Sequence, residues 1–303
     1  MPAHDGPPAI GITLFPTDRS MPPAELAREI EDRGFATFWV PEHSPLPASR
    51  EKPWPGSPDG SEPLPDTYWH LNDQIVGLAM AAAVTTRLRL GTAVTLVAQH
   101  DPIWLAKQLA TLDSLSRGRL RLGVGFGWNR EQGEQHGVPF ADRRRLTEDH
   151  LGIMRALWTQ EEASHGGALR SLAPSWAHPK PARADGPPVL LGGGGGPVLF
   201  DAIARYADGW MPISARPTIR DRLEPLRRRF EAVGRDPDSI EVAVMGATTD
   251  PAGLANLGRE GVQRAILTVW SEDRDEILRT LDEYAAVMDE VGATSTPSTR
   301  GTT

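Results

Sequence analysis

The segment Leu88–Gly125, which reads LRLGTAVTLVAQHDPIWLAKQLATLDSLSRGRLRLGVG, contains the pattern that decides the fold. Its two ends, Leu88–Val94 and Leu120–Gly125, are short apolar runs of the kind typical of buried strands. Between them, Ile103–Leu115 has the pattern of a helix, and Asp113–Arg119 ends that helix and turns directly into the second run. A strand, a helix and a strand in this order predict two parallel strands with the helix packed outside the sheet.

The same alternation extends in both directions through almost the whole chain of 303 residues. Eight strands and eight helices in strict alternation favour an α/β fold of the closed (β/α)8 type, a TIM barrel, over an open doubly wound sheet. The predicted strands are Ala9–Phe15, Thr37–Pro41, Leu88–Val94, Leu120–Gly125, Val189–Gly192, Gly209–Ile213, Ile240–Met245 and Ala265–Trp270. The predicted helices are Pro23–Arg33, Asp73–Thr85, Ile103–Leu115, Arg144–Trp158, Val198–Tyr206, Ile219–Val233, Ala252–Gly261 and Asp273–Val291.

Two insertions interrupt this spacing, one after the second predicted strand and one before the fifth. Ser44–Asn72 is rich in Pro, Gly and Ser and contains several aromatic residues. A loop of this length is usually functional or disordered, and its aromatic side chains favour a substrate lid. Glu161–Pro188 is predicted to hold a short hairpin. Residues 1–292 are expected to form a single barrel domain, and residues 293–303, which lack an apolar pattern, a disordered tail.

Composition excludes several classes of function. The formal net charge of −8 argues against nucleic acid and anionic membranes as partners, although a local basic pocket is compatible with it. Because the chain has no cysteine, disulfides, thiolate metal sites and thiol nucleophiles are excluded. The histidines show no metal-ligand spacing, so no metal site is expected. Met1–Asp5 does not resemble a signal peptide and no run of eighteen apolar residues occurs, which predicts a cytoplasmic protein.

The strongest local signal for a binding site is Val189–Pro197, an apolar strand followed by five glycines and the start of a helix. Such a junction brings bare backbone N–H groups to a helix N-terminus, which is the arrangement that a phosphate requires. A flexible turn is the alternative interpretation. The position of the run after a barrel strand, in the second half of the chain, favours a phosphate site at Gly192–Gly196.

Glu42 and His43 follow the second predicted strand and are delivered to the same edge of the barrel. An imidazole exchanges protons near neutral pH, and an adjacent carboxylate can hold its charge state. A pair of this kind at a strand end is as often structural as catalytic. Its position beside the aromatic insertion favours catalysis.

A third segment carries the pattern Gly123-x-Gly125-x-Gly127 and then Asn129. Because no helix is expected to begin immediately after it and no acid lies at the required distance, we reject a Rossmann dinucleotide site. Gly125 and Gly127 are instead predicted to let the backbone approach a flat ring, with Asn129 hydrogen-bonding at its edge.

Together these motifs resemble the luciferase-like monooxygenase superfamily and, within it, the F420-dependent oxidoreductase branch. The similarity extends from about Ile10 to Met288. The matching blocks are Gly11–Phe15, Phe38–His43, Leu90–Val94, Ser116–Gly125 with Gly127–Asn129, and Gly193–Gly194 with Ala207–Trp210. The resemblance implies a TIM barrel with a tricyclic cofactor ring at its C-terminal mouth.

The resemblance also implies which residues contact the cofactor. The phosphate would be held by Gly193, Gly194 and Gly195, with Ser214 and Arg216 as possible helpers after the sixth strand.

Three further positions match residues around the ring in this superfamily. Ala93 and Val94 correspond to a non-proline cis peptide at the end of the third strand, which forms a bulge that supports the ring. Asn129 matches an asparagine that contacts the ring.

An acid–histidine pair next to the deazaflavin in F420-dependent members is matched here by Glu42 and His43. A glutamate that exchanges a proton in the sugar-phosphate dehydrogenase branch is replaced here by Phe126. This departure argues against a sugar-phosphate substrate. It leaves His43 as the main acid or base, with Glu42 orienting it.

The predicted function is therefore hydride transfer between F420 and a small organic substrate held under the lid. In F420 a carbon atom replaces flavin N5, so hydride is transferred without activation of oxygen. An FMN-dependent luciferase-like monooxygenase is the alternative, and a flavin-binding protein without turnover is a second one, which predicts a blocked mouth. The tryptophans and prolines of the lid favour a partly apolar or aromatic substrate, and the resemblance implies a homodimer.

Overall fold

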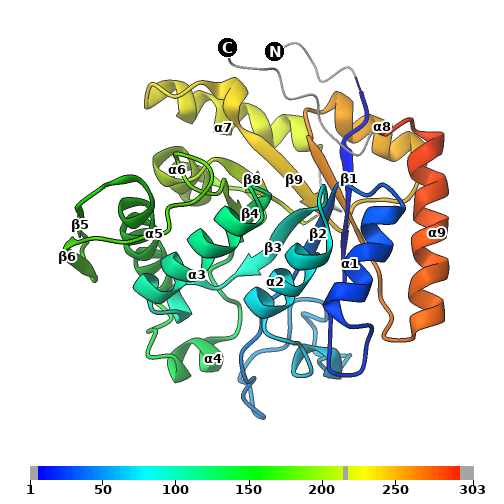
Figure 1. Cartoon of the computed structure of the whole chain (residues 1–303), viewed down its shortest axis with the longest axis horizontal. Helices are drawn as coiled ribbons and strands as arrows, with labels where there is room; N and C mark the ends of the chain where they lie inside the picture. The colour runs from blue at the N-terminus through cyan, green and yellow to red at the C-terminus, as the bar shows by residue number, and fades with distance from the viewer. Residues whose placement is uncertain (1–5, 214–217, 294–303) are drawn as a thin grey trace.

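The computed structural model describes residues 6–213 and 218–293 and confirms the predicted barrel. Eight parallel strands close in the order β1-β2-β3-β4-β7-β8-β9-β10, and β10 pairs back onto β1 (Figure 1). The connecting helices lie outside the barrel, as right-handed crossovers require. The predicted tail, residues 293–303, lies outside the described residues except for Ala293.

The observed elements agree with the predicted ones to within one or two residues at each end, apart from those in the insertions and one additional short helix. The barrel strands are β1 (Ala9–Thr13), β2 (Thr37–Val40), β3 (Arg89–Thr95), β4 (Leu120–Val124), β7 (Val189–Gly192), β8 (Gly209–Met211), β9 (Glu241–Met245) and β10 (Arg264–Thr268). The α-helices are α1 (Pro23–Asp32), α2 (Gln74–Val84), α3 (Pro102–Leu115), α4 (Arg130–Gln135), α5 (Arg143–Thr159), α6 (Pro197–Tyr206), α7 (Ile219–Ala232), α8 (Pro251–Arg259) and α9 (Arg274–Glu290).

Aspartates set the start of several outer helices. The carboxylate that precedes each of these helices accepts a hydrogen bond from a backbone N–H of the first turn, which satisfies a donor that the helix itself leaves free. Each such cap stabilises a helix by about 1 kcal/mol. The capping residues are Asp73 for α2, Asp101 for α3, Asp250 for α8 and Asp273 for α9.

The barrel interior is filled around the indole of Trp39, which is fully buried. Two glycines on the neighbouring strands make room for this side chain. A Cβ atom on Gly91 would lie 2.1 Å from the Trp39 ring, and one on Gly11 would lie 2.8 Å from its Nε1. The interior is therefore packed with side chains and is not a channel.

Both insertions contain ordered elements. Residues 161–188 hold the antiparallel pair β5 (Ala163–Gly166) and β6 (Ser171–Ser175), which confirms the predicted hairpin. Residues 44–72 hold the 3-10 turn Asp66–Tyr68 and lie at the end of the barrel where α4 also lies, at the bottom of Figure 1.

Helix α4 corrects one prediction. The sequence pattern indicated no helix directly after Gly123-x-Gly125-x-Gly127, yet α4 begins at Arg130. A helix of six residues without apolar side chains shows no hydrophobic periodicity, so the sequence pattern does not reveal it. The strand before it belongs to a closed barrel, so the rejection of a Rossmann site is unaffected. Among the described residues, no helix is both long and apolar enough to cross a membrane.

Candidate active site

The residues predicted for the site gather at one end of the barrel. Strands β2, β3, β4 and β7 are successive neighbours, and His43, Val94, Gly125 and Gly193 lie at or directly beyond their carboxyl ends. Because all barrel strands point the same way, these ends meet around one mouth. The structure thus brings the predicted residues together, while their roles stay predictions.

The glycine run has the backbone geometry expected of an anion cradle. Gly195 adopts a positive φ of 81°, and a Cβ atom there would lie 2.9 Å from the Trp210 ring, so only glycine fits. Gly194 faces open space, because a Cβ atom there would meet nothing within 4 Å. Within the described parts of the chain, the backbone N–H groups of Gly194, Gly195 and Gly196 have no hydrogen-bond acceptor. Three free amides at the start of α6 could hold a phosphate.

Arg222, in the first turns of α7, places a cation beside this run. Its guanidinium donates a hydrogen bond to the carbonyl of Gly194. Sequence reasoning missed Arg222 and named Ser214 and Arg216 instead, which lie outside the described residues. The only signal that could have pointed to Arg222 is its position near the start of the helix that follows β8.

The bulge predicted at the end of β3 is present. The Ala93-Val94 peptide is cis, and the pairing register between β3 and β4 shifts between Thr92 and Thr95. The side chain of Val94 fills the space that Gly125 leaves, since a Cβ atom on Gly125 would lie 2.3 Å from Val94 Cγ2. The glycine at the end of β4 is thus required by packing against the bulge.

Asn129 serves as the N-cap of α4 with one half of its side-chain amide. Its Oδ1 accepts a hydrogen bond of 2.8 Å from the backbone N–H of Gln132. Its Nδ2 is buried and has no partner among the described residues. A buried donor without an acceptor is costly, so Nδ2 is the atom through which Asn129 could contact a bound ring.

Glu42 has other partners than the sequence indicated. The predicted role was to orient His43, but the Glu42 carboxylate accepts hydrogen bonds from His100 Nε2 at 2.6 Å and from the backbone N–H of Leu96 at 2.5 Å. It therefore ties the end of β2 to the segment that follows the Val94 bulge. His100 was not predicted, because nothing in its local sequence reveals a partner 58 positions away.

The Glu42–His100 pair shifts the titration of His100. Burial acts to lower the pKa of His100, but the hydrogen bond and the negative charge of Glu42 outweigh it and raise that pKa above the ordinary 6.5. Near neutral pH His100 is therefore protonated in a larger fraction of molecules than an isolated histidine would be.

We expect this pair to stabilise the protein in a pH-dependent way. A histidine whose pKa is raised by folding contributes fully below its unfolded pKa, and the contribution is lost as pH rises through the raised value. The difference in free energy of unfolding between the wild type and His100→Gln should thus be larger at about pH 5.5 than at about pH 9. Urea unfolding measures it, and an equal difference at both pH values would contradict the ion pair.

His43 is held by Gln132 of α4. Gln132 Nε2 donates to Ser44 Oγ at 2.9 Å, so its Oε1 faces His43 Nδ1 at 3.2 Å and accepts from it. This arrangement leaves Nε2 of a neutral ring as an acceptor, and among the described residues no group bonds to it. Burial lowers the pKa of His43 from 6.5, against the opposing effects of Gln132 and Glu42. His43 is therefore neutral near pH 7 and can take up a proton at Nε2.

Aromatic side chains surround His43 at the mouth. Its ring lies 5.1 Å from that of Tyr68 and 6.1 Å from that of Trp128, measured between centroids. Phe15, after β1, lies 5.0 Å from Tyr68 and 5.5 Å from Trp270, after β10. Three strand ends and the insertion thus contribute to one apolar wall, which suits an apolar or aromatic ligand.

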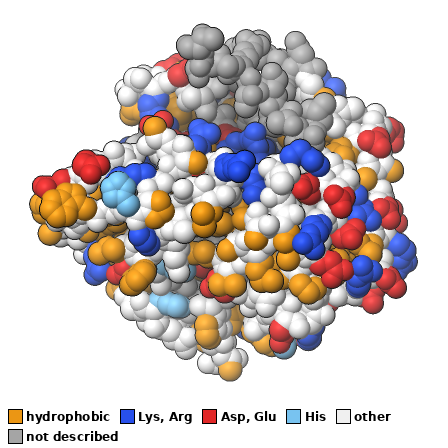
Figure 2. All heavy atoms as spheres, in the orientation of Figure 1, with side chains coloured by type: hydrophobic (Ala, Val, Ile, Leu, Met, Phe, Trp, Pro, Cys, Tyr) orange, Lys and Arg blue, Asp and Glu red, His pale blue; other side chains and the backbone are white. Residues whose placement is uncertain are grey.

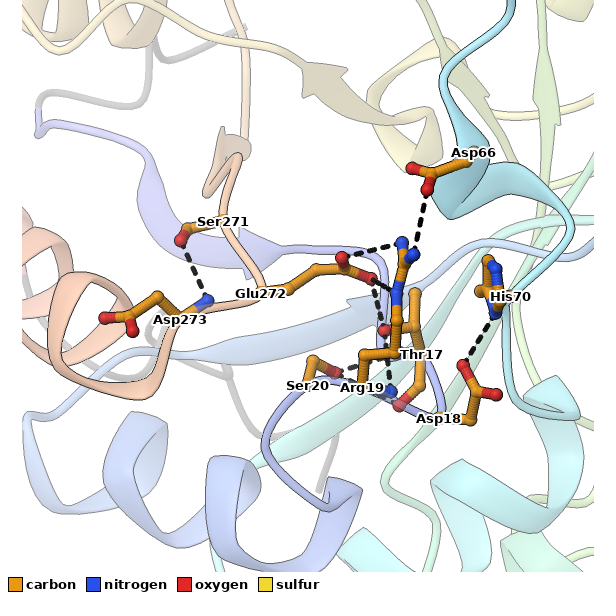
Figure 3. Close-up of polar contacts among 9 residues, drawn as sticks. All are labelled: Thr17, Asp18, Arg19, Ser20, Asp66, His70, Ser271, Glu272 and Asp273. Carbon is orange, nitrogen blue, oxygen red and sulfur yellow. Dashed lines mark hydrogen bonds and ion pairs between the residues drawn. The ribbon is translucent and has the colours of Figure 1, made fainter.

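The carboxyl-terminal end of the insertion is fastened to the barrel rim by polar contacts (Figure 3). Arg19, in the loop after β1, pairs with Asp66 of the insertion at 2.8 Å and with Glu272 of the loop after β10 at 2.7 Å. Asp18 accepts a hydrogen bond of 2.8 Å from His70. Exposed ion pairs are individually weak, so this cluster positions the insertion more than it stabilises the fold.

Phe126, where the resemblance would place a glutamate of the sugar-phosphate dehydrogenase branch, has a side chain that exchanges no proton. Its ring lies under the guanidinium of Arg144, whose Cζ is 4.3 Å from the ring centroid.

No set of metal ligands was found in residues 6–213 and 218–293, where no group of three or more His, Asp or Glu side chains could hold an ion.

Comparisons with known proteins agree with this architecture. A profile of the family described as luciferase-like monooxygenase matches residues 22–249. An uncharacterized protein of Mycobacterium tuberculosis is 41% identical over 276 residues, which span 91% of this chain and 97% of that protein.

Solved structures with the same fold include enzymes of two kinds. The monooxygenase RslO1 from Streptomyces bottropensis matches with a TM-score of 0.75 and 21% identity, covering 94% of this chain and 99% of that one. The coenzyme F420-dependent tetrahydromethanopterin reductase from Methanopyrus kandleri matches with a TM-score of 0.67 and 16% identity, covering 92% and 98%. At such identities the likeness establishes the fold alone.

Proposed function

Because the chain belongs to the luciferase-like monooxygenase family, we propose that it is an F420-dependent oxidoreductase that transfers a hydride between the deazaflavin and a small organic substrate. The observation that carries the proposal is a histidine, His43, whose Nε2 is left as an acceptor at the same mouth as the backbone amides of Gly194–Gly196, which have no acceptor among the described residues. Hydride transfer to or from an alcohol or carbonyl needs a group that exchanges a proton with the substrate, and the amides would hold the cofactor by its phosphate.

The residues at the mouth fit a phosphorylated tricyclic cofactor. The amides of the glycine run would hold its phosphate, with Arg222 adding positive charge. Asn129 Nδ2, a buried donor without a partner in the described residues, would contact the ring edge. The bulge at Ala93-Val94 would support one ring face.

When bound, F420 would supply or accept the hydride at a ring carbon, and the protein would manage the accompanying proton. His43 is suited to this task because Gln132 fixes its tautomer and burial keeps it neutral near pH 7. It can accept a proton from an alcohol at Nε2 or return one in the reverse direction. Tyr68, Phe15 and Trp270 would exclude water around the substrate and favour an apolar or aromatic one.

The alternative is an FMN-dependent monooxygenase, which the same cradle would also accommodate. The name of one structural neighbour is that of a monooxygenase and the name of another that of an F420-dependent reductase. The neutral His43 favours F420, because hydride transfer to or from a carbonyl or alcohol requires a proton acceptor or donor near the substrate. Binding of a flavin without turnover would leave His43 and the aromatic wall without a role.

Titration of the purified protein with F420 and, separately, with FMN tests the proposal. We expect saturable binding of F420, followed by fluorescence, at a concentration at least about tenfold lower than that needed for FMN, a difference of about 1.4 kcal/mol. Preferential binding of FMN would replace the proposal with its alternative. Binding of neither cofactor would remove the assignment of the mouth as a cofactor site.

A further inference from the structure

A second pocket lies at the opposite end of the barrel, where the chain enters the strands. Its volume is about 430 Å³, and it lies between the loops that lead into β2, β3, β4 and β7. Lys and Arg side chains gather in the upper central part of the face shown in Figure 2, the end of the barrel away from the 44–72 insertion. The charged residues that line the pocket are Arg87, Arg89, Arg117, Arg119, Arg121, Arg183 and Glu31.

The acids near this pocket are already engaged. The Glu31 carboxylate accepts hydrogen bonds from the backbone N–H groups of residues 86–88, the shortest at 2.6 Å from Arg87. Burial acts to raise the pKa of Glu31, but these hydrogen bonds outweigh it and lower that pKa. The Asp113 carboxylate accepts from the N–H groups of Leu120 and Ala182. Neither acid forms an ion pair with an arginine side chain in the described residues.

One of the six arginines is also engaged. Arg119 donates to the carbonyl of Ser116, the hydroxyl of Thr85 and the carbonyls of Leu88 and Ala82, so its guanidinium holds the α2–β3 and α3–β4 turns together. By contrast, within residues 6–213 and 218–293 the side chains of Arg87, Arg89, Arg117 and Arg183 make no hydrogen bond or ion pair. Four guanidinium groups at one pocket are therefore available for a ligand.

The deepest arginine of the pocket is poorly neutralised. Arg121 is 8% exposed, and its Nε has no hydrogen-bond partner in the part of the chain that the structure describes. Its nearest acid, Glu241, lies 3.4 Å away and is engaged more closely by Arg264 at 2.5 Å. Burial, together with the charges of Arg264 and Arg89, lowers the pKa of Arg121 to about 9 although Glu241 opposes the shift. A buried cation with so little compensation favours a bound anion.

The size and charge of the pocket decide which anion fits. Six arginines against one carboxylate form a strong local positive field on a chain whose formal net charge is −8. The concentration of this field in a hollow, on an otherwise acidic protein, disfavours an extended polyanion such as nucleic acid. The planar guanidinium fork matches phosphate oxygens in pairs, and several forks facing one hollow match more than one phosphate.

We propose that this pocket binds a small anion that carries two or more phosphate groups, either free inorganic diphosphate or the phosphates of a nucleotide. The proposal does not depend on the function proposed for the mouth. The two sites lie at opposite ends of the barrel and share no residue.

Isothermal titration with inorganic pyrophosphate, and separately with ADP, tests the proposal. The Gly194→Asp variant is used as the background so that the glycine run at the mouth does not contribute. We expect saturable one-to-one binding. Equal affinity for both ligands would identify the diphosphate group as the ligand, and tighter binding of ADP would identify a nucleotide. Binding of neither would overturn the proposal.

Two matched double variants in the same background locate the binding. Arg87→Gln with Arg183→Gln removes two exposed guanidinium groups from the pocket and should weaken binding by about tenfold or more, because the charge-assisted hydrogen bonds of both groups to phosphate are lost. Arg228→Gln with Arg279→Gln removes the same charge from α7 and α9 and should leave binding unchanged. Equal weakening in both doubles would mean that binding depends on net charge and not on this pocket. No weakening in the first double would mean that the anion binds elsewhere, and either result would overturn the proposal.

Discussion

Replacing Gly194 with aspartate is expected to weaken cofactor binding by roughly 100-fold or more, because like charges brought together cost several kcal/mol. The new carboxylate would lie beside the backbone amides of Gly194–Gly196, where the phosphate is proposed to bind. The fold should tolerate the change, since a Cβ atom at Gly194 meets nothing within 4 Å and its φ is not positive. Fluorescence titration with F420 measures the effect, and thermal unfolding checks the fold.

The matched control is Gly194→Asn, which adds a side chain of the same shape without charge. It should weaken binding by less than about tenfold, because only space near the phosphate is lost. If the asparagine and aspartate variants bind equally well, the glycine run does not hold an anion. The phosphate site would then have to be sought elsewhere on the barrel.

Replacing His43 with asparagine is expected to lower kcat by about 10²–10⁴-fold, the usual contribution of a general acid or base. Asparagine can still donate to Gln132 Oε1, but it lacks the acceptor that Nε2 provides. Burial lowers the pKa of His43 below its ordinary value of 6.5. If His43 accepts the proton, we expect the rate of alcohol oxidation by F420 to fall as the pH drops through this lowered pKa. The fall in activity at low pH should be absent from the His43→Asn variant.

The measurement follows F420 absorbance with the most active member of a panel of aromatic alcohols and ketones. His136→Asn is the control, because His136 lies next in the same hydrogen-bonded chain, 2.7 Å from Ser44 Oγ, but does not contact His43. It should retain kcat within about tenfold. A His43 variant with an unchanged pH profile would mean that another group handles the proton.

Much of the barrel could be predicted because its signals are local. The run Leu120–Val124, which is apolar except for Arg121, was recognisable as a buried strand, and all five of its residues are buried. The aspartate at position 101 starts α3 through its own carboxylate. Helix α4 escaped prediction because its six residues are too few to show a period. The hairpin β5–β6 was located only approximately, since short strands outside the core carry a weak pattern.

The candidate site divides in the same way. The strand ends, the glycine run and His43 could be located from the sequence alone, because neighbouring residues are enough to indicate where glycine is required and where strands and helices alternate. The hydrogen-bond partners of Glu42 and His43 could not be predicted in this way. Glu42 faces His100 rather than His43, and Gln132 fixes the tautomer of a histidine 89 positions away. Such contacts depend on which strand ends and loops meet after the barrel closes, and they are invisible until the tertiary structure brings distant residues within hydrogen-bond distance.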